Sequence, residues 1–296
     1  MNRKRILATA PLPATVLWGG MYVVSKWGFS EIPPLTLAFL RVVIGASVLY
    51  LGVCVTTPAR SFSRQEWWRF ATLAIWLTAA LTTQFVGTDL TNASQGSLLT
   101  VLTPVFMVVL GVTTLGEHLT RGKVVGTGLA SVGTLVVLLG QYEVNTFTNG
   151  NLFGVGLLLF SAFSFAAFSA FGKPLIERYS ALETATYATV LSVPLFGALV
   201  PVELYLHPTA LDSVSVTLPV IGAVLYLGLM STAVAWYCWY KGMEYADAST
   251  VAVYFFAQPI VGIMLGSILL GESIDISIVG GGVPLILGVF LVNRAG

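Results

Sequence analysis

Long apolar runs separated by short polar segments follow one another from one end of the chain to the other. Each run has at least 18 residues without Lys, Arg, Asp, Glu or His, and there are ten of them: 6–25, 42–59, 70–88, 90–116, 124–142, 144–172, 184–202, 213–240, 248–271 and 276–293. A helix needs about 20 apolar residues to cross a bilayer. None of the runs alternates as a barrel strand would. The pattern therefore predicts an all-α integral membrane protein with ten transmembrane helices.

The composition supports a membrane environment. Charged residues make up 9% of the chain and hydrophobic residues 56%, whereas soluble domains carry about 25% charged residues. We therefore expect the lipid bilayer to be a partner of this chain. The net charge of +1 shows no basic excess, so no nucleic-acid partner is expected. Cys54 and Cys238 lie inside apolar runs, so we expect no disulfide framework, no metal site and no cofactor.

The loops predict how the chain is oriented. Cytoplasmic loops carry an excess of Lys and Arg. If the N-terminus is cytoplasmic, the inside segments hold 12 of the 14 basic residues: Arg3, Lys4, Arg5, Arg60, Arg64, Arg69, Arg121, Lys123, Lys173, Arg178, Lys241 and Arg294. The reverse orientation would place all 12 outside. We therefore expect both termini in the cytoplasm, a multi-pass protein of the plasma (inner) membrane, and a first run that is a membrane helix rather than a removed signal peptide.

An internal repeat divides the chain. Residues 87–94 (GTDLTNAS) match residues 242–249 (GMEYADAS) at an offset of 155 residues. The same offset aligns further pairs: Pro104 with Pro259, Gly111 with Gly266, Glu117 with Glu272, Gly126 with Gly281, and Gly133 with Gly288. Earlier in the chain, an offset of 147 residues aligns Trp18 with Phe165 and Lys26 with Lys173. We infer two five-helix repeats, residues 1–142 and 143–296. Because five is odd, the repeats are expected to be inverted, an architecture typical of secondary transporters.

The proline and Gly-Glu pattern of the fourth and ninth runs, Trp18-Gly19-Gly20 and Arg41 resemble the EamA-type transporters of the drug/metabolite transporter superfamily. Within that family the chain is most similar to the YddG-type aromatic amino-acid exporters. The resemblance covers essentially the whole chain. It implies amino-acid efflux from the cytoplasm through a central cavity lined by helices 1, 3, 4, 6, 8 and 9.

Pro104 and Pro259 lie about a dozen residues into the fourth and ninth expected helices. A proline inside a helix removes the hydrogen bond to the carbonyl four residues back, which frees the carbonyls of Thr100 and Phe255. The two prolines either kink the helices at a substrate cavity or serve packing alone. Neutral polar side chains around them suit a zwitterionic ligand: Ser97, Thr100, Thr103, Tyr254 and Gln258.

Aromatic side chains in the first, sixth and eighth runs are candidates for the wall of such a cavity. Aromatic rings stack on apolar groups and hold ammonium groups by cation–π contacts. The candidates are Trp18, Tyr22, Phe165, Phe168, Trp236 and Trp239, with Gln84 as a polar neighbour. Trp and Tyr also gather at membrane interfaces, and this is the preferred interpretation for Trp239 and Tyr240.

Lys26 and Arg41 are the basic residues inside or near the outer ends of spans. Their side chains are expected to reach the headgroups. Alternatively they form an outer site that attracts a carboxylate or pairs with Glu31 or Asp89 as a gate. Glu117 and Glu272 end their runs and are expected to hydrogen-bond the backbone ends of neighbouring helices.

No Asp or Glu lies deep inside any of the ten runs. Proton-driven antiporters usually place a carboxylate there. We therefore expect facilitated export of aromatic and other neutral amino acids by alternating access, with a proton-coupled exporter of drugs or other small metabolites as the alternative. A channel function is a further alternative that the sequence does not exclude. A membrane enzyme is disfavoured because His118 and His207 both fall in loops. The sequence leaves the oligomeric state open, a monomer included.

Overall fold

The structure is a computed structural model that describes residues 7–91, 99, 102–141, 152–211, 214–258, 260–261, 264–265 and 277–295. Within these ranges every regular element is a helix. In chain order they are α2 (Pro11–Gly28), α3 (Pro34–Thr56), α4 (Arg64–Leu90), α6 (Thr103–Leu115), α7 (Arg121–Gln141), α9 (Leu152–Arg178), α10 (Ala181–Leu206), α11 (Leu218–Leu225), the π-helix η2 (Tyr226–Val234), α12 (Ala235–Met243), α13 (Ala248–Ala252), the 3-10 helix η3 (Val253–Phe256) and α15 (Ser277–Ala295).

Local signals in the sequence explain where several helices begin and end. Ser63 and Glu66 form a capping box at the start of α4, in which each side chain bonds the other residue's backbone N–H. This pairing satisfies two donors that the first turn of a helix leaves open. Pro34 begins α3, where its fixed φ suits the first turn. Gly116 ends α6 with a φ of 67°, a conformation that favours glycine.

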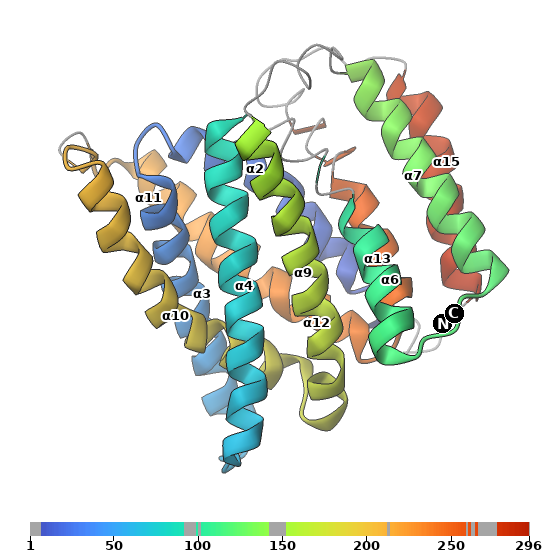
Figure 1. The fold of residues 1–296 in the computed structure, drawn as a ribbon, viewed down its shortest axis with the longest axis horizontal. Helices are drawn as coiled ribbons and strands as arrows, with labels where there is room; N and C mark the ends of the chain where they lie inside the picture. Colours follow the sequence, from blue (N-terminus) through green and yellow to red (C-terminus); the bar gives the residue numbers. More distant parts are fainter. Residues whose placement is uncertain are drawn as a thin grey trace.

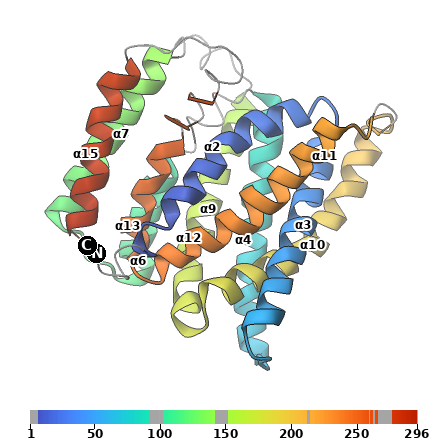
Figure 2. The ribbon, with the colours of Figure 1, turned by 180° about the vertical axis from the view of Figure 1, so that it is seen from behind.

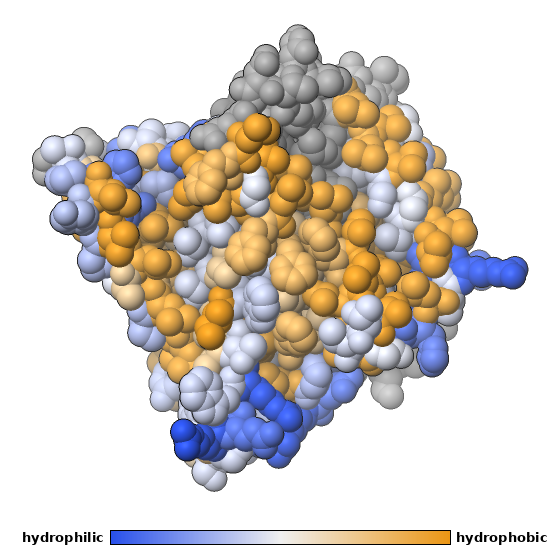
Figure 3. Space-filling view, in the orientation of Figure 1, coloured by the Kyte–Doolittle hydropathy of each residue, from blue (hydrophilic) through white to orange (hydrophobic). Residues whose placement is uncertain are grey.

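Five helices among the described residues are long and apolar enough to cross a membrane: α3, α4, α9, α10 and the continuous segment Leu218–Met243. Helix α3 begins at Pro34, eight residues before the charge-free run 42–59, and continues through the charged Arg41. Large apolar side chains such as Val109, Val132 and Ile286 are exposed. Figure 3 shows apolar residues over most of one face, with hydrophilic residues at the end where α4 begins. This surface is that of a protein surrounded by lipid.

Helices α7 and α15 lie side by side at one edge of the bundle (Figures 1 and 2). A Cβ atom added to Gly126 would lie 2.7 Å from the carbonyl oxygen of Gly288, and one added to Gly133 would meet the carbonyl oxygen of Gly281. The residue numbers rise along α7 as they fall along α15, so the two helices are antiparallel. Adding 155 to the number of Gly126 or Gly133 gives Gly281 or Gly288, so each contact maps onto the other. These two sequence-equivalent helices therefore run in opposite directions.

Two lysines provide a second pair of related contacts. Lys26 in α2 donates from Nζ to the carbonyl oxygens of Thr88 (3.2 Å) and Thr91 (3.5 Å) at the end of α4. Lys173 in α9 donates in the same way to those of Met243 (2.6 Å) and Ala246 (3.2 Å) at the end of α12. The offsets of 147 and 155 residues convert one set of partners into the other. In each case a cation caps the negative end of a helix.

Candidate functional site

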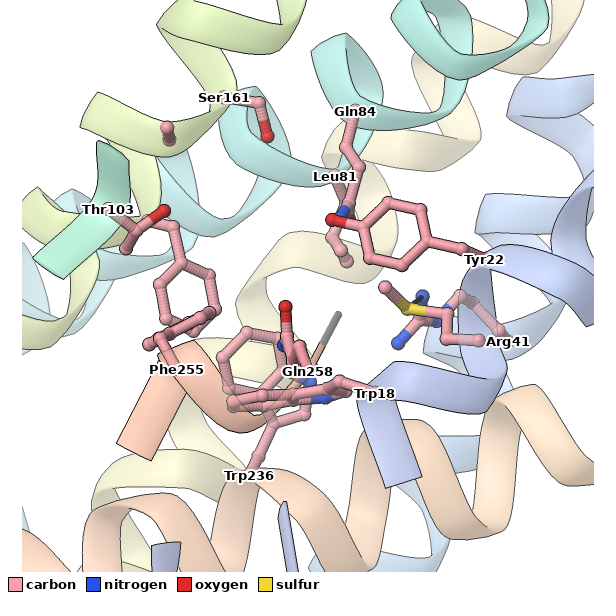
Figure 4. A pocket seen from close by; sticks show the side chains of 13 residues that line it. Trp18, Tyr22, Arg41, Leu81, Gln84, Thr103, Ser161, Trp236, Phe255 and Gln258 are labelled. Atoms are coloured by element: carbon pink, nitrogen blue, oxygen red, sulfur yellow. Dashed lines mark hydrogen bonds between the residues drawn. The ribbon is translucent and has the colours of Figure 1, made fainter. Parts of the chain in front are cut away.

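A small cavity lies in the middle of the bundle (Figure 4). Its volume is about 20 Å³. That is room for about one water molecule, whereas pockets for small molecules measure about 300–1,000 Å³. The described side chains that line it are Trp18, Met21, Tyr22, Arg41, Leu81, Gln84, Thr103, Ser161, Ala162, Phe165, Trp236, Phe255 and Gln258. Because the cavity is so small, an organic ligand can enter only if helices or side chains move apart.

Aromatic rings from α2, α9, α12 and η3 form one wall of the cavity. The Trp18 ring is stacked on Phe255, with centroids 5.6 Å apart and planes at 23°. Its edge contacts Phe165 at 5.3 Å, and Phe165 in turn stacks on Trp236 at 5.2 Å. The Trp18 indole is held in place because Nε1–H donates to the carbonyl oxygen of Ser231, 2.9 Å away in the π-helix η2.

Polar groups also line the cavity. The Gln84 amide donates to the Tyr22 hydroxyl at 2.7 Å, and both residues line the cavity. The Thr103 side chain, at the start of α6, is buried and also lines the cavity. Gln258 is buried, and its Oε1 atom has no hydrogen-bond partner among the described residues. These groups can bind a polar ligand through neutral hydrogen bonds.

Arg41 corrects the expectation of a side chain that reaches the headgroups. Its exposed fraction is 0%, and its guanidinium faces the cavity. It donates to Thr232 Oγ1 and to the carbonyl oxygen of Ser231, both at 3.0 Å, and to the Met21 sulfur at 2.9 Å. Neither Glu31 nor Asp89 forms an ion pair with it in this structure. The helix carries Arg41 inward because α3 begins seven residues earlier, about 10 Å away.

Trp239 and Tyr240 correct the expectation of an interfacial position. Both are fully buried. Trp239 Nε1 donates to Ser169 Oγ at 3.0 Å, and the Tyr240 hydroxyl donates to the carbonyl oxygen of Phe168 at 3.0 Å. These protein partners replace the water and headgroups that an interfacial Trp or Tyr would use. Trp239, Phe168 and Tyr254 are therefore buried behind the lining side chains rather than among them.

The other candidates are helix-end contacts or fall outside the described residues. Lys26 binds carbonyls at the end of α4, including that of Asp89 rather than its carboxylate. Glu117 accepts from the backbone N–H groups of Ala248 (2.7 Å) and Ser249 (3.0 Å), at the start of α13. Pro104 is buried in the first turn of α6, which begins at Thr103. Ser97, Thr100, Pro259 and Glu272 lie outside the described residues.

Sequence reasoning did not place several lining residues in the site: Met21, Leu81, Ser161, Ala162 and the side chain of Phe255. Ser161 lies one helical turn before Phe165, which is a signal that could have indicated it. Its hydroxyl donates to the Ala80 carbonyl at 2.7 Å and so joins α9 to α4. The aliphatic residues have no such signal, because one apolar side chain in an apolar helix resembles the next.

A larger hollow opens at the end of the bundle that we predict to face outside. Its volume is about 760 Å³, and its lining includes Phe29, Glu31, Asp89 and His207. The Phe85 ring lies between this hollow and the central cavity. It contacts Phe29 with centroids 5.4 Å apart, and the Arg41 guanidinium carbon lies 5.4 Å from its centroid.

Ion pairs join the two halves of the chain at the other end. Glu66 pairs with Arg178 at 2.7 Å, and Arg60 pairs with Glu183 at 3.4 Å. Lys123 also pairs with Asp247. All of these residues adjoin loops that we predict to be cytoplasmic.

The profile of the EamA-like transporter family matches this chain twice, over residues 7–139 and again over residues 152–294. The chain belongs to the EamA-like transporter family. It is a multi-pass membrane protein, since members of this EamA family are transporters and five of its described helices can cross a bilayer.

Relatives that are named transporters agree with the EamA assignment, and one solved structure shares the fold. An uncharacterized transporter of Archaeoglobus fulgidus is 27% identical over 94% of this chain and 95% of its own. A probable terminal-alkyne amino-acid exporter of Streptantibioticus cattleyicolor is 31% identical over 68% of this chain and 64% of its own. A probable amino-acid metabolite efflux pump of Salmonella typhimurium is 24% identical over 95% and 92%. One crystal structure, 19% identical, matches 98% of both chains with a TM-score of 0.78 and shares the fold.

Proposed function

We propose that this EamA transporter exports amino acids, aromatic and other neutral ones, from the cytoplasm across the plasma (inner) membrane. In this proposal ten transmembrane helices form two inverted five-helix repeats, residues 1–142 and 143–296, with both termini in the cytoplasm. The repeats exchange conformations and open the central cavity to each side in turn. Two of the related proteins are named for amino-acid export or efflux.

The observation that carries the proposal is the aromatic wall of the cavity. Trp18 and Phe165 contact one another there, and neutral polar groups of Gln84, Tyr22 and Gln258 lie on the same cavity. Such a lining suits a substrate with an apolar or aromatic side chain and a polar end. The small volume supports a closed state that must widen for each transport cycle.

The cavity also bears on energy coupling. No carboxylate is among the described residues that line it. The buried Glu183 and Glu203 are engaged at helix ends: Glu203 accepts from the backbone N–H groups of Leu35 and Thr36 at the start of α3. We therefore propose facilitated efflux down a substrate gradient. A proton-coupled exporter of drugs or other small metabolites is the alternative outcome.

Uptake by the purified protein in liposomes distinguishes facilitated transport, proton coupling and a channel. Labelled phenylalanine uptake is measured with and without a pH gradient, and protein-free liposomes give the background. Saturable uptake that ignores the gradient supports facilitated amino-acid transport, and uptake that needs the gradient supports proton coupling. Flux that rises linearly with concentration would indicate a channel, and absence of amino-acid uptake in both conditions would refute the amino-acid substrate.

A further inference from the structure

The Arg41 guanidinium is a buried charge, and no carboxylate among the described residues pairs with it. None of the ion pairs formed by the described residues includes Arg41. Its partners there are a hydroxyl, a carbonyl, a thioether and an aromatic ring. Burying a charge away from water is costly unless an opposite charge or strong hydrogen bonds compensate. A position this costly inside a membrane protein points to a binding role.

The bonds of the guanidinium leave room for an anion. Arginine has five N–H donors in a planar fork that fits a carboxylate. Three bonds to described atoms are present, and the one from Nη1 goes to the Met21 sulfur. A thioether is a weak acceptor. A carboxylate in the cavity would replace that contact with charge-assisted hydrogen bonds, which are about twice as strong as neutral ones.

A second group on the same cavity complements an ammonium group. Gln258 Oε1 is a buried acceptor without a partner in the described part of the chain. In Figure 4 this oxygen points into the cavity, with the Trp18 ring beside it and the Arg41 guanidinium on the other side of the same cavity. A buried acceptor without a donor is costly, and an ammonium N–H would satisfy it. Trp18 could add a cation–π contact.

We propose that Arg41 binds the carboxylate of the substrate and that Gln258 accepts from its ammonium group. The inference rests on the proposed amino-acid transport and specifies how the substrate is recognised. The site takes zwitterions that carry a carboxylate and an ammonium group, with the side chain against the Trp18 wall. It rejects organic cations without a carboxylate, because an uncompensated buried guanidinium repels them.

Substrate pairs separate binding from a purely structural role, in which Arg41 only fastens α3 to η2. Uptake into liposomes is compared for phenylalanine and phenylalaninamide, which keeps the ring and the amine and lacks the carboxylate. We expect the wild type to prefer phenylalanine at least about tenfold in kcat/KM. Arg41→Gln is expected to reduce this preference to within about twofold, mainly by lowering uptake of phenylalanine. The matched control Arg64→Gln, on the exposed first turn of α4, is expected to keep the wild-type preference.

A second pair tests Gln258. Relative to the wild type, Gln258→Leu is expected to weaken phenylalanine transport about tenfold and to leave 3-phenylpropionate, which lacks the ammonium group, within about twofold. Equal losses of both substrates would overturn the role of Gln258.

The outcomes distinguish this inference from the proposed function. A wild type that transports phenylalanine and its amide equally well would overturn the recognition by Arg41 and leave amino-acid transport standing. This comparison needs no variant, so it decides the matter even if Arg41→Gln does not fold. Equal loss of both substrates in a folded Arg41→Gln would also overturn it. Saturable uptake of neither compound by the wild type would refute both the inference and the proposed function.

Discussion

Trp18 and Phe165 meet edge to face in the centre of the bundle, with ring centroids 5.3 Å apart and planes at 86°. They are also the residues that the offset of 147 positions makes equivalent in the two halves. Two equivalent residues of a pair of inverted repeats can contact one another only near the axis that relates the repeats. Their contact therefore lies where a substrate site shared by both halves is expected.

Replacing Trp18 tests the wall of the cavity. Trp18→Ala removes the ring contacts with Phe165 and Phe255, so we expect KM for phenylalanine to rise at least about tenfold. Trp18→Phe keeps a ring and loses the Nε1 bond to Ser231, so a smaller rise is expected. The control is Trp68→Ala, because Trp68 is 62% exposed at the start of α4. An unchanged KM in folded Trp18→Ala would remove Trp18 from the site.

Glu117 is predicted to stabilise the start of α13. Glu117→Gln replaces a charged acceptor of two backbone N–H groups with a neutral amide. We expect the free energy of unfolding to fall by about 1–2 kcal/mol, seen as a lower Tm in detergent. Glu177→Gln is the control, since that side chain is 61% exposed in a pair with Lys173 and exposed pairs contribute about 0–1 kcal/mol. Equal Tm values for the two variants would contradict the capping role.

The close contact of α7 with α15 is tested by two glycines of the same helix. An added Cβ at Gly126 would lie 2.7 Å from backbone and side-chain atoms of α15, whereas one at Gly128 meets nothing within 4 Å. Gly126→Ala is expected to destabilise the protein by about 1–3 kcal/mol. Gly128→Ala is expected to be neutral or stabilising, because alanine favours helices by up to about 1 kcal/mol over glycine. Thermal unfolding checks both, and a stable Gly126→Ala would refute this packing.

The orientation of the chain is tested with a membrane-impermeant maleimide. Single cysteines replace Arg60, Arg178 or the 84% exposed Tyr205 in a background of Cys54→Ala and Cys238→Ala. We expect cysteines at positions 60 and 178 to react only after the cytoplasmic side is opened. The cysteine at position 205 should react in intact cells. Labelling of positions 60 and 178 from different sides would exclude the predicted inverted topology.

The sequence predicted the helical class because lipid forces apolar runs to form helices. It also predicted equivalent pairs, such as Lys26 and Lys173, which make matching contacts. Arg41 and Trp239 were misplaced for one common reason. Average preferences place Arg and Trp at the membrane interface, but specific partners such as Ser231 and Ser169 keep these two inside. Those partners come from distant helices, and no local pattern reveals them.

The carbonyl oxygen of Ser231 accepts hydrogen bonds from both Trp18 Nε1 and Arg41 Nη2. One acceptor in a π-helix thus holds two helices together: α2, which supplies an aromatic surface, and α3, which supplies a positive charge. If either donor moves away, the hydrogen bond from the other donor to this oxygen becomes stronger. An anion that binds the guanidinium would therefore change the hydrogen bond of the Trp18 indole through this one shared oxygen.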